Sequence, residues 1–330
     1  MPLSDVHLPV MVDEVVALFA PVPAGYVVDA TAGWGGHAAA ILAAHPQLRL
    51  VCLDRDPEAV HAASERLSAF GDRATVRHAA FDHLLDEAEA AGAEPGSLAG
   101  VLFDLGVSSS QLDTPRRGFS YRHDGPIDMR MDPTTGRTAA EVVNEWPAEA
   151  LARLFAENGE GRFARRIARA VVSSRPLSST TQLAEVVRTA IPAAARRHGG
   201  HPARRVFQAL RTAVNDELGM LSRALPDALD ALAPGGRCVA LAYHSGEDRL
   251  VKSAFALAVS GGCTCPPGLP CTCGASPQGR LVFRGARRPT PAEVARNRRA
   301  ESARMRAFER ARTDLAERDL GAFRRPSGGL

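Results

Sequence analysis

The sequence predicts an α/β fold in which a helical insert interrupts an open parallel sheet after its fourth strand. Residues 1–110 alternate short β-rich runs with Ala- and Leu-rich helical runs, a pattern typical of parallel strands joined by crossover helices. This alternation stops near residue 111 and returns with a helical run at 216–232. We therefore expect a core in two parts, 1–110 and 212–330, around a helical insert at 111–211.

Each expected strand ends at, or directly before, a polar residue or a glycine. The expected strands are 26–30, 48–54, 74–78, 100–105 and 237–243. Helical runs lie between them and in the insert, at 37–44, 57–70, 149–174, 181–190, 202–211 and 216–232. A loop rich in Gly, Pro and Asp spans 117–136, and an Arg-rich helix is expected at 292–319.

Length and composition indicate an enzyme of the cytoplasm. The chain has 330 residues, of which 45% are hydrophobic, so it exceeds one ordinary domain and can bury a substantial core. No apolar run approaches the roughly 20 residues that a membrane-spanning helix needs. The first residues lack the basic and apolar regions of a secretory signal.

Positive charge is concentrated in two segments. Lys252 is the only lysine beside 39 arginines, and a GC-rich genome alone would enrich arginine. Residues 160–211 nevertheless carry a net +9 and residues 280–330 a net +8, so the remainder carries −14. Codon bias cannot segregate charge in this way. Two basic zones on an acidic body suggest a polyanionic partner, although the alternating Arg and Glu residues near the C-terminus also fit a solvated helix face.

The strongest local motif is Val27-Val-Asp-Ala-Thr-Ala-Gly-Trp-Gly-Gly-His, in which a strand, an acid and a glycine-rich turn precede a helix. Glycines let the backbone approach a ligand, and a helix N-terminus offers unpaired N–H groups. Asp54 follows Gly35 by nineteen residues and closes the second strand, where a carboxylate can bind ribose hydroxyls.

The glycine spacing favours S-adenosylmethionine over NAD. A dinucleotide site needs the pattern G-x-G-x-x-G, whereas this turn has Gly33, Gly35 and Gly36 and no glycine three positions after Gly35. Asp29 stands at the mouth of the turn, where it would repel a pyrophosphate. It would suit the ammonium of a methionine moiety.

Further motifs carry a specific resemblance. They are Asp104-Leu-Gly-Val-Ser-Ser-Ser-Gln-Leu-Asp, Arg117-Gly-Phe-Ser-Tyr, Asp124-Gly-Pro-Ile-Asp-Met-Arg-Met-Asp, Arg162-Phe-Ala-Arg-Arg-Ile-Ala, His201-Pro-Ala-Arg-Arg-Val-Phe-Gln-Ala-Leu-Arg and Tyr243-His-Ser-Gly-Glu-Asp-Arg-Leu-Val-Lys. The chain resembles the ribosomal RNA small subunit methyltransferase H family from His7 to about Arg306. It departs from the pattern at Gly246, 158–161 and 297–300, outside the cofactor motifs.

The resemblance implies a class I, Rossmann-like methyltransferase that transfers a methyl group from S-adenosylmethionine to N4 of a cytosine. The substrate would be 16S rRNA of the small ribosomal subunit, in its decoding region. The cofactor contacts of the family fall on Gly35, Gly36, His37, Asp54, Phe81, Asp104 and Gln111. For Phe81 the alternative is an ordinary core aromatic, and for His37 it is packing at the helix start.

Asp104 and Ser108 are the catalytic candidates. The N4 amine is a weak nucleophile that must be aligned with the methyl group while an acceptor binds its developing positive charge. The alternative for Ser108 is to cap the next helix. Methylation at carbon 5 would need a cysteine nucleophile, and the motif from Asp104 to Gln111 contains none.

Two more segments have open interpretations. In the loop 117–132, Phe119 and Tyr121 could stack on a flipped base while its aspartates bind a base edge, or those acids could only hold the loop. In the helical run 202–211, Arg204, Arg205 and Arg211 could bind phosphates or pair with acids of that loop.

Four cysteines, Cys263, Cys265, Cys271 and Cys273, fit either a tetrathiolate zinc site or a reduced loop, and we assign no metal to them. C-x-C is a less typical zinc spacing than C-x-x-C, and a reducing compartment argues against disulfides.

Three other functions remain in competition. An NAD-dependent oxidoreductase is disfavoured by the glycine spacing, and a methyltransferase of small molecules by the basic insert. An RNA-binding module without activity is disfavoured by the intact turn and by the two acids Asp54 and Asp104.

Overall fold

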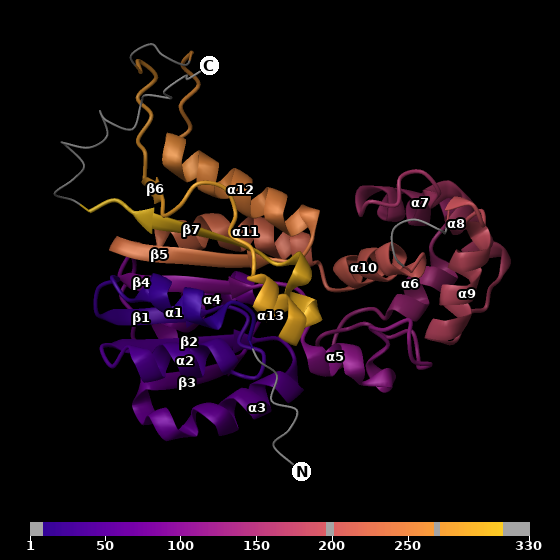
Figure 1. Ribbon diagram of the computed structural model, residues 1–330, viewed down its shortest axis with the longest axis horizontal. Coiled ribbons are helices and arrows are strands. Elements are labelled where there is room, and N and C mark those ends of the chain that lie inside the picture. The colour runs from indigo at the N-terminus through magenta and orange to yellow at the C-terminus, as the bar shows by residue number, and fades with distance from the viewer. Residues whose placement is uncertain (1–8, 196–200, 267–270, 313–330) are drawn as a thin grey trace. The chain divides into compact units, whose positions relative to one another are not determined.

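The computed structural model describes residues 9–195, 201–266 and 271–312, and the chain divides into two compact units (Figure 1). The first unit combines Met1–Gly106 with Met220–Leu330, and the second is Val107–Gly219. The second unit thus interrupts the first between its fourth and fifth strands. Within the described ranges, no helix is long and apolar enough to cross a membrane.

Seven strands form the sheet of the first unit in the order β3-β2-β1-β4-β5-β7-β6, which Figure 1 shows as a stack. β1 to β5 pair in parallel, and β7 is antiparallel to both of its neighbours. The strands are β1 (Gly25–Asp29), β2 (Leu48–Asp54), β3 (Ala74–His78), β4 (Leu98–Asp104), β5 (Leu232–Ala242), β6 (Gly279–Leu281) and β7 (Arg304–Arg310). The expected α/β fold is confirmed.

Helices cover both faces of this sheet because successive strand residues point to opposite sides. Val28 and Phe103 pack in one buried cluster with α4, α11 and α12, whereas Val27 and Leu102 pack in the other with α1 and α2. The α-helices that lie wholly or mostly in the first unit are α1 (Val12–Phe19), α2 (Gly36–Ala44), α3 (Pro57–Leu67), α4 (Leu84–Ala90), α11 (Glu217–Asp230), α12 (Ser245–Ser260) and α13 (Pro291–Arg296). The buried strands therefore read as apolar runs, as the sequence shows.

The second unit is helical and has its own core. Leu151, Phe155, Ile167, Val206 and Leu210 are fully buried in one cluster. The helices are α5 (Ser109–Asp113), α6 (Ala139–Glu145), α7 (Ala148–Glu157), α8 (Ala164–Ser173), α9 (Thr180–Ala190) and α10 (Ala203–Val214). Capping boxes fix the starts of α6 and α9, where a Ser or Thr hydroxyl and a Glu or Gln side chain satisfy exposed N–H groups.

The structure corrects two expected helices. The run 149–174 forms two helices, α7 and α8, because Asn158-Gly-Glu-Gly separates them. The helix expected at 292–319 is wrong: α13 ends at Arg296, and Arg304–Arg310 is β7, which pairs with β5. Residues 313–319 lie outside the described residues.

Tertiary contacts explain why the Arg-rich C-terminal segment is a strand. Met305, Ala307 and Phe308 are buried against the sheet, which requires an extended backbone. The charged residues beside them are paired, since Arg306 binds Asp248 of α12 at 2.8 Å and Glu309 binds Arg237 of β5 at 2.6 Å. Neither partner could be identified from local pattern, so helix propensity gave the wrong element.

Candidate functional site

Three carboxylates end neighbouring strands of the sheet. Asp29, Asp54 and Asp104 are the last residues of β1, β2 and β4. β2 lies on one side of β1 and β4 on the other, so the winding of the sheet reverses there. Open α/β sheets bind ligands at the carboxyl ends of the strands that flank such a reversal. The three acids lie close enough that Asp54 and Asp104 both raise the pKa of Asp29.

A glycine-rich turn leads from β1 into α2. Gly33 has a φ of +52° and Gly35 a φ of +71°, values that L side chains rarely adopt. A Cβ on Gly35 would lie 3.3 Å from Cγ of Leu67 on α3, and one on Gly36 would lie 3.2 Å from Cγ of Pro9. Tight packing is therefore one reason for these two glycines, and their contact with a ligand stays a prediction.

Asp54 holds the turn in place. Its Oδ2 accepts a hydrogen bond from the N–H of Gly33 at 2.8 Å, and its Oδ1 accepts one from the N–H of Asp56 at 2.8 Å. Burial raises the pKa of Asp54 to about 6, against the effect of these two bonds. Each carboxylate oxygen has a second lone pair, so the side chain can still accept from a ligand hydroxyl.

Asp29 is the most buried of the three acids, with 1% of its surface exposed. Oδ1 accepts a hydrogen bond from the N–H of Thr31 at 3.3 Å, whereas Oδ2 has no hydrogen-bond partner among the described residues. Burial raises its pKa to about 7, and the nearby His37 lowers it. A buried carboxylate oxygen without a donor is costly, so this atom fits a cationic group such as an ammonium.

Asp104 is held by residues from three other segments. Its Oδ1 accepts a hydrogen bond from the hydroxyl of Tyr243 at 2.8 Å, and its backbone N–H donates to the Thr31 hydroxyl at 2.6 Å. Its Oδ2 lies 3.4 Å from Nδ1 of His37. The side chain is 23% exposed, so it is fixed in orientation and still accessible.

His37 is buried at the start of α2 and connects two segments. Its Nε2 lies 2.9 Å from the carbonyl oxygen of Val10 and must donate to it, because a carbonyl only accepts. The other ring nitrogen then faces Asp104, and that contact is attractive when the ring or the carboxyl group is protonated. The structure shows packing and positioning for His37, and its contact with a cofactor stays a prediction.

Phe81 begins a short 3-10 helix, Phe81–His83, just after β3. Its ring packs edge-on against Phe103 of β4, with ring centroids 5.9 Å apart. The side chain is only partly buried, unlike Phe103, which is fully buried. Part of the Phe81 ring therefore packs in the core. Its contact with adenine stays a prediction.

Ser108 and Gln111 belong to the second unit and cap α5 together. The N–H of Gln111 donates to the Ser108 hydroxyl oxygen at 3.2 Å, and Gln111 Oε1 accepts from the N–H of Ser108 at 3.0 Å. The Ser108 hydroxyl also contacts that of Ser110 at 2.8 Å. This is the capping role left open for Ser108 by the sequence. The catalytic role of Ser108 and the cofactor contact of Gln111 stay predictions.

The acids of the loop 117–132 hold the loop itself. Asp124 binds the Thr181 side chain, Asp128 makes a two-bond ion pair with Arg130 at 2.9 Å, and Asp132 binds Thr134. These contacts favour a structural role for the loop acids over binding of a base edge.

The aromatic residues of the same loop differ from the stacking surface expected of them. Phe119 is buried, with 5% exposure, so it offers no face to a base. Tyr121 already stacks on His201, with ring centroids 4.4 Å apart, and packs edge-on against Phe207. The expectation that Phe119 stacks on a base is therefore wrong. The contacts of Tyr121 with His201 and Phe207 leave less of its ring free to stack on a base.

The arginines of α10 fall into two classes. Arg211 makes a two-bond ion pair with Glu217 at 2.7 and 2.9 Å and is 13% exposed, so it stabilises the second unit. Arg205 is 59% exposed, with a looser contact of 3.5 Å to Glu160. Arg204 is exposed. The ion pair of Arg211 favours a structural role over the phosphate contact expected of it. The acids bound by Arg211 and Arg205, Glu217 and Glu160, lie outside the loop 117–132.

Tyr243 is the site residue that the sequence reasoning did not single out. It directly follows β5, the strand next to β4, so its side chain lies beside Asp104 although the two are 139 residues apart. Burial and the neighbouring carboxylate raise its pKa well above the usual value, so the hydroxyl remains a donor. Its place at the end of the fifth strand was the signal that could have identified it.

Comparison with known proteins gives one consistent result. The sequence profile of the MraW methylase family matches residues 4–311. A protein of Acidothermus cellulolyticus is 53% identical over 319 residues, covering 94% of this chain and 96% of the relative. One of Symbiobacterium thermophilum is 51% identical over 306 residues, covering 91% and 95%. Both relatives carry the name "Ribosomal RNA small subunit methyltransferase H".

Similarity to solved structures is weaker. An rRNA methylase from Streptococcus thermophilus aligns over 93% of this chain and 100% of that chain, with a TM-score of 0.38 and 12% identity. Likeness at this level carries no argument about activity.

Proposed function

The chain belongs to the MraW methylase family, and from that premise we propose that it transfers a methyl group from S-adenosylmethionine to N4 of a cytosine in 16S rRNA. The substrate is the decoding region of the small ribosomal subunit, and the reaction takes place in the cytoplasm. The relatives' shared name and their coverage of nearly the whole chain support a ribosomal RNA substrate. The N4 position rests on the motif resemblance and on the lack of a cysteine between Asp104 and Gln111.

The single observation that carries the cofactor assignment is the unpartnered Oδ2 of Asp29. This atom lies beside a glycine-rich turn and within electrostatic reach of two further strand-end acids. An ammonium group supplies the donor that Oδ2 lacks, and the negative charge excludes the pyrophosphate of a dinucleotide. The site thus has the charge expected for an amino-acid moiety joined to a nucleoside.

The other cofactor contacts follow from position. Gly35 and Gly36 present the backbone at the start of α2, and Asp54 accepts from ribose hydroxyls while it holds Gly33. Phe81 offers the exposed part of its ring to adenine. The remaining contacts that we propose are His37, Asp104 and Gln111.

S-adenosylmethionine supplies the methyl group as an electrophilic carbon on a sulfonium. The chain's own task is to hold the cytosine amine in line with the methyl group and to accept a hydrogen bond from the amine as positive charge develops on its nitrogen. Asp104 is the acceptor in this proposal, because it is oriented by Tyr243 and remains partly exposed. Well-oriented groups lower such barriers by up to about 7–11 kcal/mol. Ser108 would assist through its backbone and hydroxyl at the start of α5.

The helical second unit is the proposed RNA-recognition element. The target base must leave its stack, so the enzyme acts on an open region or flips the base. Arg204 and Arg205 expose their guanidinium groups at the start of α10, where they can bind phosphates and position the RNA.

The test is a methylation assay followed by nucleoside analysis. Small subunits and free 16S rRNA from a strain that lacks this gene would be incubated with the purified protein and S-adenosylmethionine, then digested and analysed by mass spectrometry. We expect N4-methylcytidine at one position. A methyl group on carbon 5 of cytidine would exclude the proposed chemistry. Methylation only of another RNA or of a small molecule would show that the alternative substrate is correct.

A further inference from the structure

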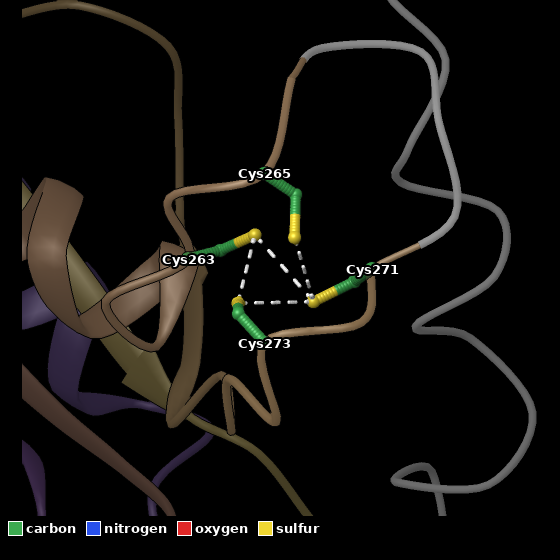
Figure 2. Close-up of side chains that lie close together, drawn as sticks. All are labelled: Cys263, Cys265, Cys271 and Cys273. Carbon is green, nitrogen blue, oxygen red and sulfur yellow. Dashed lines mark hydrogen bonds between the residues drawn. The ribbon is translucent and has the colours of Figure 1, made fainter.

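Four cysteines gather in the segment between α12 and β6 (Figure 2). None of the described residues of 261–278 is buried, and none belongs to a helix or strand. Segments of this length without secondary structure or core are uncommon in compact domains. Small elements without a core are usually held by disulfides or metals. The segment therefore needs a cross-link that apolar packing does not provide.

The sulfur atoms have the spacing of a tetrahedral metal site. Sγ of Cys271 lies 3.5 Å from that of Cys263, 4.0 Å from that of Cys265 and 3.4 Å from that of Cys273. Cys273 lies 3.7 Å from Cys263, and all four sulfurs lie within 4.8 Å of one another. Four thiolates bound to zinc at 2.3 Å stand about 3.8 Å apart. Figure 2 shows the four side chains converging on one point.

The C-x-C spacing is suitable for one ion in this fold. The sulfurs of Cys271 and Cys273 lie 3.4 Å apart and those of Cys263 and Cys265 within 4.8 Å, so both pairs converge. The N–H of Thr272 also points at Sγ of Cys265, at 3.4 Å, as a donor that stabilises a thiolate. The unusual spacing is thus no obstacle in this fold.

Other uses of four cysteines fit these distances less well. A disulfide joins two sulfurs at about 2.05 Å, and the four distances given above, 3.4 to 4.0 Å, are far longer. An iron–sulfur cluster spreads its cysteines around several metal ions, so their sulfurs stand farther apart than around a single ion. A tetrahedral set of soft thiolate ligands is typical of zinc and of iron–sulfur sites, and the distances here favour a single ion, for which we choose zinc.

The ends of the segment are attached to the first unit. A Cβ on Gly261 would lie 2.3 Å from the carbonyl carbon of Ser276, so the outgoing and returning chains touch there. The N–H of Gln278 donates to the carbonyl oxygen of Ala258 at 2.8 Å, and its side-chain amide donates to Asp230. An ion held by the four cysteines would close a small lobe on the C-terminal end of α12.

We propose that Cys263, Cys265, Cys271 and Cys273 bind one zinc ion as a structural tetrathiolate site. The ion takes no part in methyl transfer, because its ligands lie in a separate loop beyond α12. It fixes the segment that leads into β6 and so supports the edge of the sheet. The site is independent of the proposed substrate and cofactor.

Metal analysis of the full-length chain, purified without a metal-binding tag and under reducing conditions, tests the proposal. We expect elemental mass spectrometry to find roughly one zinc ion per chain. A mercurial that modifies thiols should release it. Cobalt in its place should give the visible absorption of a tetrahedral thiolate complex. A chain without metal that also binds no added zinc or cobalt would overturn the proposal, as would a chain that holds iron.

Paired variants assign the ligands. Cys271→Ser should lower zinc to less than about a tenth of an equivalent, since three thiolates bind zinc much more weakly than four. Thr264→Ala changes a neighbouring exposed residue that has no sulfur and should keep the full equivalent. Equal zinc in both variants would contradict the site. If Cys271→Ser does not fold, cobalt binding and release of zinc by the mercurial on the native chain still decide the question.

Discussion

The hydroxyl of Tyr243 donates a hydrogen bond to Asp104 Oδ1 at 2.8 Å, and this contact joins the ends of β5 and β4. Asp104 owes its orientation to a residue that follows a different strand. Tyr243 is therefore a positioning residue: it acts on the reaction through Asp104.

Removing that hydroxyl should slow methyl transfer without weakening cofactor binding. We expect Tyr243→Phe to lower kcat roughly ten- to a hundredfold, because a misplaced acceptor loses much of its effect. The Kd for S-adenosylmethionine should change less than about twofold. Tyr26→Phe is the matched control, since the Tyr26 hydroxyl binds the carbonyl of Ala91 at 2.8 Å. Equal kcat in the two variants would remove Tyr243 from the site.

Asp54→Ala should weaken cofactor binding by about ten- to a hundredfold or more, because even one hydrogen bond to a charged acceptor contributes about 1.5–3 kcal/mol. It should also lower the melting temperature of the free protein, since Gly33 and Asp56 both lose their acceptor. Asp56→Asn is the control, because asparagine caps α3 as well as aspartate does. Calorimetry that shows unchanged affinity in a folded Asp54→Ala chain would disprove the ribose contact.

The raised pKa of Asp29 predicts pH-dependent cofactor binding. Only the carboxylate attracts an ammonium, so affinity should rise with pH and level off above a pKa of about 7. With a pKa of about 7, roughly half of the Asp29 carboxyl groups are ionised at pH 7 and about a tenth at pH 6, so binding should be about fivefold weaker at pH 6. Asp29→Asn should bind weakly at every pH and lose this dependence. A native profile that is flat from pH 6 to pH 8 would contradict the assignment.

The raised pKa of Asp29 also predicts how the stability of the free protein depends on pH. Stability should fall as pH rises, whereas cofactor affinity should increase. Because this pKa is raised in the folded chain, the folded state holds a proton that the unfolded state has released between pH 4 and 7. The stability contributed by Asp29 is therefore present at low pH and lost as pH rises through about 7. Asp29→Asn should melt at a higher temperature than the native chain at pH 8, with a smaller difference at pH 5. Scanning calorimetry of both free proteins measures this.

The arginines of α10 should separate into binding and structural groups. Arg204→Ala with Arg205→Ala should weaken RNA binding and flatten its salt dependence, by roughly 0.7 to 0.9 in slope for each lost phosphate contact. Arg211→Ala should instead destabilise the chain by about 3 kcal/mol, because it leaves the nearly buried Glu217 without its partner. Lost stability in the double variant with an unchanged salt slope would indicate a structural role for all three.

Local pattern was enough for the parts of the site that lie on one strand or turn. β2 and β3 have the expected bounds, and the acids Asp29, Asp54 and Asp104 end their strands as the motifs predicted. The pairing of Asp104 with Tyr243 was missed because it depends on which strands are neighbours. The burial of Phe119 was missed because it depends on how the second unit folds.

The C-terminal strand marks the limit of the same reasoning. Alternating arginine and apolar residues fit a solvated helix and a strand equally well by composition. Contacts with β5 and with Asp248 of α12 decide between them, and these residues lie roughly 60 to 70 positions earlier in the chain.

The second unit is inserted along the chain between β4 and β5, and this insertion sets the order in which the protein can fold. β4 ends at residue 104 and β5 begins at 232, so their pairing must close a loop of more than a hundred residues. A flexible loop of that length costs about 2 kcal/mol more to close than one of ten residues. An insert with its own core lowers that cost if it folds first. Since β5 pairs in turn with Arg304–Arg310, the sheet is complete only when almost the whole chain has been synthesised.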